Sequence, residues 1–246
     1  MPESITIAVA RRLSPLLLLF FLSTGFSPQL LADTATDEAS LQEAWKTLTD
    51  KSYSKKEKAI TLIARQNTAD AYPVMKAMLE GKLYFSTRDK TLYVLSEEDN
   101  NYSFTPLFAG QSLTQESKRG FKKVKINNRL RTRLRQALAL LQLQHEDKNL
   151  RLAAVQELLK KPDSNAAGLI QEVVETETDA EIRTAMRTLL AVIQLDSANE
   201  DEQQDAIEKL ADSLNPSALN ALSAYQPPNT ALKKLADAAI QKINDR

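Results

Sequence analysis

The sequence lacks cysteine, and it has one histidine and five glycines among 246 residues. Without cysteine there is no disulfide and no thiolate nucleophile, and the single imidazole of His145 is too little for the multi-histidine sites that catalytic zinc usually needs. The glycines lie too far apart to form a Walker loop or a dinucleotide-binding turn. We therefore expect no enzyme activity, and we assign no catalytic residue, no metal site and no cofactor.

Charge of one sign is not in excess either. The chain has 32 Lys and Arg against 32 Asp and Glu, which gives a formal net charge of zero. A balanced charge implies no bulk attraction to nucleic acid or to anionic lipid. With 43% hydrophobic and 26% charged residues, the composition is that of an ordinary folded protein.

The amino terminus resembles an export signal. Arg11 and Arg12 precede a short apolar run at 16–22, and Ser, Gly and Pro then break the pattern before Ala32. An apolar run of this length is well short of the roughly 20 residues that span a bilayer as a helix. We expect residues 1–32 to be a signal peptide cleaved after Ala32, with a retained signal anchor as the alternative. The protein would then be periplasmic or lie at the periplasmic face of the inner membrane.

Residues 33–82 are predicted to be helical. Apolar side chains recur at helical spacing in three stretches, 41–48, 59–63 and 71–79, and each set forms one stripe. Gly81 follows the last stripe, at the position where a helix often ends in a left-handed residue. The periodicity changes at this point, so we place a boundary here.

Residues 83–125 are predicted to form a β-hairpin insert followed by a basic linker. Aromatic and β-branched runs at 83–85, 91–95 and 102–104 are separated by charged turns, which is typical of an antiparallel hairpin or a three-stranded insert. Six of the thirteen Phe and Tyr residues lie between 84 and 108. A lone hairpin is marginal in water, so these aromatic rings are expected to pack onto neighbouring helices.

Residues 126–246 contain an ungapped internal repeat at a spacing of 52. Residues 131–143 (RTRLRQALALLQL) align with 183–195 (RTAMRTLLAVIQL), with seven of thirteen positions identical, and a partial third copy begins near Ala231. Each copy is expected to be one long helix followed by two shorter ones. A unit of this size must bury its apolar face against its neighbours. We therefore predict an all-α, HEAT- or armadillo-like solenoid with a small β-hairpin insert.

The most conspicuous candidate site is basic. Residues 118–135 carry nine Lys and Arg and no carboxylate, and such a run could dock an acidic partner or lie near phospholipid head groups. In the helical part, however, the arginines flank an apolar stripe, which favours pairing with acids on adjacent helices, in 172–181 or 196–208. The candidate docking residues are Lys122, Lys123, Lys125, Arg129, Arg131, Arg133 and Arg135.

Four segments carry a resemblance to a known family. They are 81–84 (GKLY), 108–113 (FAGQSL), 124–131 (VKINNRLR) and 151–155 (RLAAV). In these segments the chain resembles the amino-terminal extracytoplasmic region of the permease subunit of bacterial urea ABC transporters, a branched-chain amino acid permease family. The resemblance covers nearly all of the chain after the signal segment.

The resemblance implies a docking or structural role in urea uptake, with the permease body and the urea-binding protein as partners. It implies no urea-binding residue in this region. In that family several membrane helices follow, and this sequence stops about where they would begin, so the chain by itself is expected to form no conduction path. It would be a fragment, a truncated product or a separate accessory domain. The alternative function is a free-standing periplasmic scaffold with unrelated partners.

Overall fold

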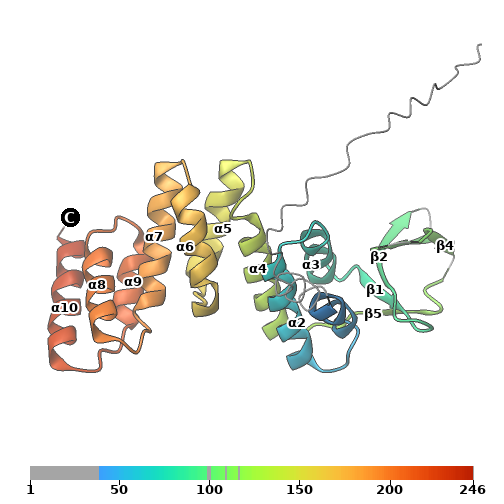
Figure 1. Ribbon diagram of the computed structural model, residues 1–246, viewed down its shortest axis with the longest axis horizontal. Coiled ribbons are helices and arrows are strands. Elements are labelled where there is room, and N and C mark those ends of the chain that lie inside the picture. The colour runs from blue at the N-terminus through green and yellow to red at the C-terminus, as the bar shows by residue number, and fades with distance from the viewer. Residues whose placement is uncertain (1–38, 99–100, 109, 116, 246) are drawn as a thin grey trace, which may run out of the picture. The chain divides into compact units, whose positions relative to one another are not determined.

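The computed structural model describes residues 39–98, 101–108, 110–115 and 117–245. These residues are mostly helical, and a small antiparallel sheet interrupts the helices (Figure 1). No helix in the described ranges is long and apolar enough to cross a membrane. The expected signal segment, residues 1–32, lies outside the described residues.

The helices predicted before the sheet are confirmed. They are a helical segment at 39–47, α2 (Tyr53–Gln66) and α3 (Ala71–Leu79). Ser52 caps α2 by accepting a hydrogen bond from the backbone N–H of Lys55. Gly81 follows α3 with a φ of 73°, the left-handed conformation that glycine adopts most readily.

The sheet has five strands, not the two or three that the sequence predicted. The strands are β1 (Leu83–Ser86), β2 (Leu92–Glu98), β3 (Asn101–Pro106), β4 (Leu113–Gln115) and β5 (Phe121–Lys123), in the order β4-β3-β2-β1-β5, and every pair is antiparallel. The three predicted strands are confirmed as β1 to β3. The basic linker was wrong as a description of 121–123, because these residues pair with β1. Three residues are too few for a strand alternation to be recognised.

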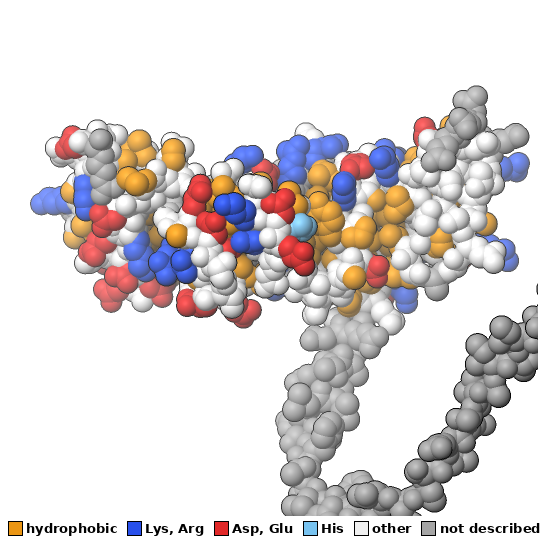
Figure 2. All heavy atoms as spheres, turned by 90° about the horizontal axis from the view of Figure 1, so that it is seen from above, with side chains coloured by type: hydrophobic (Ala, Val, Ile, Leu, Met, Phe, Trp, Pro, Cys, Tyr) orange, Lys and Arg blue, Asp and Glu red, His pale blue; other side chains and the backbone are white. Residues whose placement is uncertain are grey.

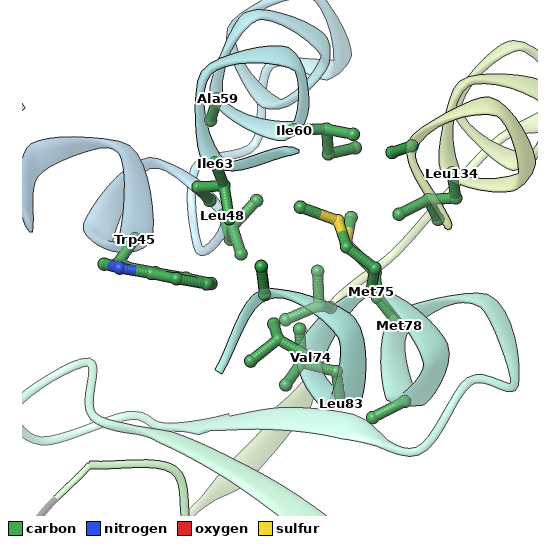
Figure 3. Close-up of a cluster of buried hydrophobic side chains, with 14 of the residues drawn as sticks. Trp45, Leu48, Ala59, Ile60, Ile63, Val74, Met75, Met78, Leu83 and Leu134 are labelled. Atoms are coloured by element: carbon green, nitrogen blue, oxygen red, sulfur yellow. The ribbon is translucent and has the colours of Figure 1, made fainter. Parts of the chain in front are cut away.

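The two faces of the sheet bury different side chains. Leu83, Phe85 and Leu92 join the core formed by the preceding helices and α4, as Figure 3 shows for Leu83. On the other face, Phe104 is fully buried and stacks on Phe121 with a centroid distance of 3.8 Å. Their strands, β3 and β5, are separated by two others, so the sheet must curl to bring these rings together.

Seven further helices follow the sheet. They are α4 (Asn128–Gln142), α5 (Lys148–Lys160), α6 (Ala167–Thr176), α7 (Ala180–Gln194), α8 (Glu200–Ala211), α9 (Pro216–Ala224) and α10 (Thr230–Asn244), with a short 3-10 turn, η1 (Ser164–Ala166), before α6. The bounds of α7 are those of α4 displaced by 52 residues, and α10 has the bounds of α7 displaced by 50. One long helix is followed by two shorter ones in each complete copy, as predicted.

Each copy shares its core with the next. One apolar cluster joins α4, α5 and α6 to α7, and a second joins α7, α8 and α9 to α10. Helix α7 contributes to both clusters, with Leu189 in the first and Ala191 in the second. An amphipathic unit is therefore completed by its neighbour in the chain.

The three long helices begin with the same cap. Asn127, Asp179 and Asn229 precede α4, α7 and α10, and each side chain accepts a backbone N–H of the first turn. We expect Asn127→Ala to lower the free energy of unfolding by about 1 kcal/mol, because the N–H of Leu130 loses its acceptor. Asn127→Asp, which copies the cap of α7, should cost less. Guanidinium denaturation would measure both, and equal costs would contradict the assigned cap.

Candidate functional site

The basic residues predicted as a docking surface lie on two elements. Lys122 and Lys123 are on β5, Lys125 follows in the connection, and the four arginines are on α4. Lys122 and Lys123 are opposite Phe85 and Tyr84 of β1, and consecutive strand residues point to opposite faces. The structure therefore does not bring all seven side chains to one face.

Two of the arginines are held by acids on neighbouring elements. Arg129 and Arg133 both reach Glu57 of α2, with nitrogen–oxygen distances of 2.8 and 3.6 Å, and Arg133 also pairs with Asp163. Burial alone would raise the pKa of Asp163, but hydrogen bonds from Asn165 and Arg133 outweigh it and lower that pKa. The side chain of Arg133 therefore binds acids within the protein and is not available to a partner.

The predicted pairing with acids is thus confirmed for Arg129 and Arg133, although Glu57 and Asp163 lie outside the acidic stretches that the sequence suggested. Arg131 and Arg135 are exposed on α4 and form no ion pair with any described residue. These two side chains are the part of the predicted surface on α4 that stays available to a partner.

A small cavity of about 250 Å³ lies between α2, α4 and α6. Its polar lining is already used by the protein: Arg65 donates to the carbonyl of Asn165, and Gln136 donates to the carbonyl of Lys161. Arg133 and Asp163 pair with each other at its edge. The cavity offers no uncommitted arginine to an anion.

The most buried ion pair among the described residues joins Arg151 of α5 to Glu177, in the connection between α6 and α7. Arg151 Nε and Nη2 donate to the carboxylate at 2.8 and 3.0 Å, and the Glu177 side chain is only 2% exposed. The hydrogen bonds from Arg151 lower the pKa of Glu177 despite its burial. Arg151 also donates to the carbonyls of His145 and Glu146, so it fastens two interhelical connections together.

Lys56 is a buried cation on α2 that was not among the predicted site residues. It is 3% exposed, its Nζ donates to the carbonyl of Lys125 at 2.8 Å, and burial lowers its pKa. Its position, three and four residues before Ala59 and Ile60, falls on the apolar stripe of α2 and could have indicated burial. The contact ties α2 to the segment that leads into α4.

His145 lines a pocket together with Arg151 and Glu177, whose side chains pair with each other. The imidazole of His145 lies between α4 and α5, where Nδ1 accepts the backbone N–H of Asp147 at 3.0 Å. This hydrogen bond orders the turn that begins α5. Within the described ranges, no group of three or more His, Asp or Glu side chains is placed to hold a metal ion.

Two grooves on the repeats were not apparent from the sequence. One, of about 500 Å³, lies between α4 and α5, and the other, of about 520 Å³, lies between α7 and α8 and is bordered by α6. Arg135 lines the first groove, and Arg187, 52 residues later, lines the second. The grooves therefore occupy equivalent places in the two copies.

A third, wider groove of about 800 Å³ is apolar and lies between the segment 39–47 and the β1–β2 turn. Trp45 and Phe108 meet there edge to face, with ring centroids 5.4 Å apart, and Phe108 is 52% exposed.

Charges of both signs are interspersed on the face seen in Figure 2, which agrees with the balanced composition.

Comparison with protein-family models, with curated proteins and with solved structures gave no match to this chain.

Proposed function

We propose that this chain is an exported helical-repeat module that docks other proteins in a urea ABC transporter, and that it has no enzyme activity of its own. Its helices would stack as in HEAT and armadillo solenoids. The partners would be the permease body and the urea-binding protein, with the chain at the periplasmic face of the inner membrane.

The observation that carries the docking role is the repetition of α4 to α6 in α7 to α9. The copies share their cores with each other, so most of their apolar side chains pack within the chain. What remains for partners is the outer side of each helix pair, where Arg131, Arg135 and Arg187 are exposed. Proteins built in this way typically use an extended surface for binding.

The assignment to urea uptake rests on the segments 81–84, 108–113, 124–131 and 151–155. Two of them have structural tasks that fit a repeat module: Asn127 caps α4, and Arg151 anchors the connection before α5. These two residues stabilise the fold, and they do not identify the partner that the chain binds.

Uptake of labelled urea at limiting concentration tests this assignment. We expect deletion of the reading frame to lower urea uptake by an order of magnitude or more in a host that depends on this transporter, and re-expression of the full chain to restore it. Uptake of an unrelated amino acid is the control. If urea uptake is unchanged, the urea assignment fails, and a free-standing periplasmic scaffold takes its place.

A further inference from the structure

The identical positions of the internal repeat gather in the two equivalent grooves. Seven of thirteen aligned positions are the same in 131–143 and 183–195. Four of these seven pairs line the grooves between α4 and α5 and between α7 and α8: Arg135 and Arg187, Leu138 and Leu190, Ala139 and Ala191, Gln142 and Gln194.

Core packing explains only part of this identity. Ala139 and Ala191 are 3% and 1% exposed, so their small size is needed where the helices meet. Arg135 and Arg187, by contrast, are exposed, and neither forms an ion pair within the described part of the chain. Internal packing therefore does not account for an arginine at this position in both copies.

Each groove is lined by at least one cation that forms no ion pair with a described residue, and such a cation can bind a carboxylate. The acids already have partners: Glu157 pairs with Lys160 at 2.6 Å, Glu175 accepts the side-chain amide of Gln171, and Asp212 pairs with Lys242. The cations Arg135, Arg187 and Lys209 have no acidic partner among the described residues. Each groove thus offers an uncommitted positive charge above an apolar floor.

We propose that the two grooves together bind one extended acidic segment of a partner protein, with a carboxylate at Arg135 and another at Arg187. Leu138 and Leu190 supply apolar contact. The side-chain amide of Gln194, which makes no hydrogen bond in the described structure, pairs with the main chain of the segment. The proposal deepens the docking role and does not require that the partner belong to a urea transporter.

The packing order sets the spacing of the two carboxylates. Helix α5 packs against both α4 and α7, so two interaxial distances of 8–10 Å separate the grooves by about 20 Å. An extended chain rises about 3.3 Å per residue, so the second acid follows the first by about six positions, with about five residues between them.

The third copy marks the end of this surface. Asp237 of α10 stands 50 residues after Arg187, at the same position of the helix, and it pairs with Lys233 at 2.8 Å. The positive charge is therefore replaced by an acid already paired within α10. The acidic segment is expected to span two copies and not three.

The probe is a fluorescein-labelled peptide of about 14 residues, with two Asp-Glu pairs separated by about five neutral residues. Binding to the full-length chain is measured by fluorescence anisotropy. We expect R135Q and R187Q each to weaken binding about tenfold, and the double variant about a hundredfold, because each arginine provides a charge-assisted hydrogen bond. Doubling the separation of the acidic pairs should also weaken binding about tenfold, since only one groove is then occupied at a time.

The matched control is R88Q/R119Q, which removes two exposed cations from the sheet region and should change binding less than twofold. Far-UV circular dichroism checks that every variant is folded. Equal loss in R135Q/R187Q and in the control would overturn the proposal, as would independence from peptide spacing. A third outcome is that the chain binds phosphatidylglycerol vesicles but not the peptide, and that this binding also requires Arg135 and Arg187. The ligand of the grooves would then be a lipid head group and not a protein segment. Because no step measures urea uptake, this test can fail or succeed separately from the transport assay.

Discussion

Arg151→Met is expected to lower the free energy of unfolding by about 3–5 kcal/mol, because it leaves the carboxylate of Glu177 buried without its cation. The substitution also removes the donors to the carbonyls of His145 and Glu146. Methionine fills much of the volume of the arginine stem, so the loss of apolar packing contributes little to the expected loss of stability.

Urea denaturation monitored by circular dichroism would measure this loss. Lys160→Met is the matched control, since Lys160 forms an exposed pair with Glu157 on the same helix and should matter by less than about 1 kcal/mol. The double variant R151Q/E177Q should recover part of the stability, because a buried neutral pair carries no unpaired charge. A loss in R151M no larger than in the control would show that the pair is dispensable.

The same pair has a pH signature. Arg151 lowers the pKa of Glu177 below its unfolded value of about 4.5. The stabilisation is therefore complete above that pH, and it is lost as the pH falls through the lower folded-state pKa, because the unfolded chain then binds more protons. The stability gap between the wild type and E177Q should narrow below pH 4.5. A gap independent of pH between 6 and 3 would contradict the assigned charge state.

Phe104→Ala is expected to destabilise the sheet by about 3–5 kcal/mol, since it empties the centre of the small aromatic cluster. Phe104 stacks on Phe121 and meets Tyr84 and Tyr93 edge to face, so four strands lose a contact together. The helical cores do not include Phe104, and their stability should change much less.

Hydrogen exchange followed by mass spectrometry resolves this prediction by region. Peptides from 83–123 should exchange faster in F104A, while peptides from α7 and α10 keep their wild-type protection. Leu113→Ala is the control, because Leu113 is 45% exposed in β4 of the same sheet. Uniform loss of protection across the chain would mean that the sheet and the helices unfold as one unit.

The helices could be predicted because their apolar side chains recur over whole turns. The internal repeat also predicts the position of α7 from that of α4, since the identity of 131–143 with 183–195 fixes both helices at once. Strands β4 and β5 could not be found in this way. They have three residues each, and their pairing depends on partners many residues away, which leaves no local pattern.

The candidate site, like the fold, could be predicted only where it depends on residues close together in the sequence. The run of basic residues is visible in the sequence, but the acids that neutralise part of it are distant: Glu57 precedes Arg129 by a whole sheet, and Asp163 lies beyond α5. The grooves depend on which sides of α4 and α7 remain uncovered after packing. The repeat offered a signal that sequence reasoning passed over, because Arg135 and Arg187 are identical although they are exposed.

The sheet begins and ends at one place on the helical body. The backbone N–H of Val124 donates to the carbonyl of Leu83 at 2.9 Å, so the chain leaves α3 and returns to α4 through adjacent residues. The segment between Leu83 and Val124 is therefore one insertion whose two ends lie next to each other. We expect insertions in the exposed turns between these two positions to leave the path from α3 to α4 unchanged.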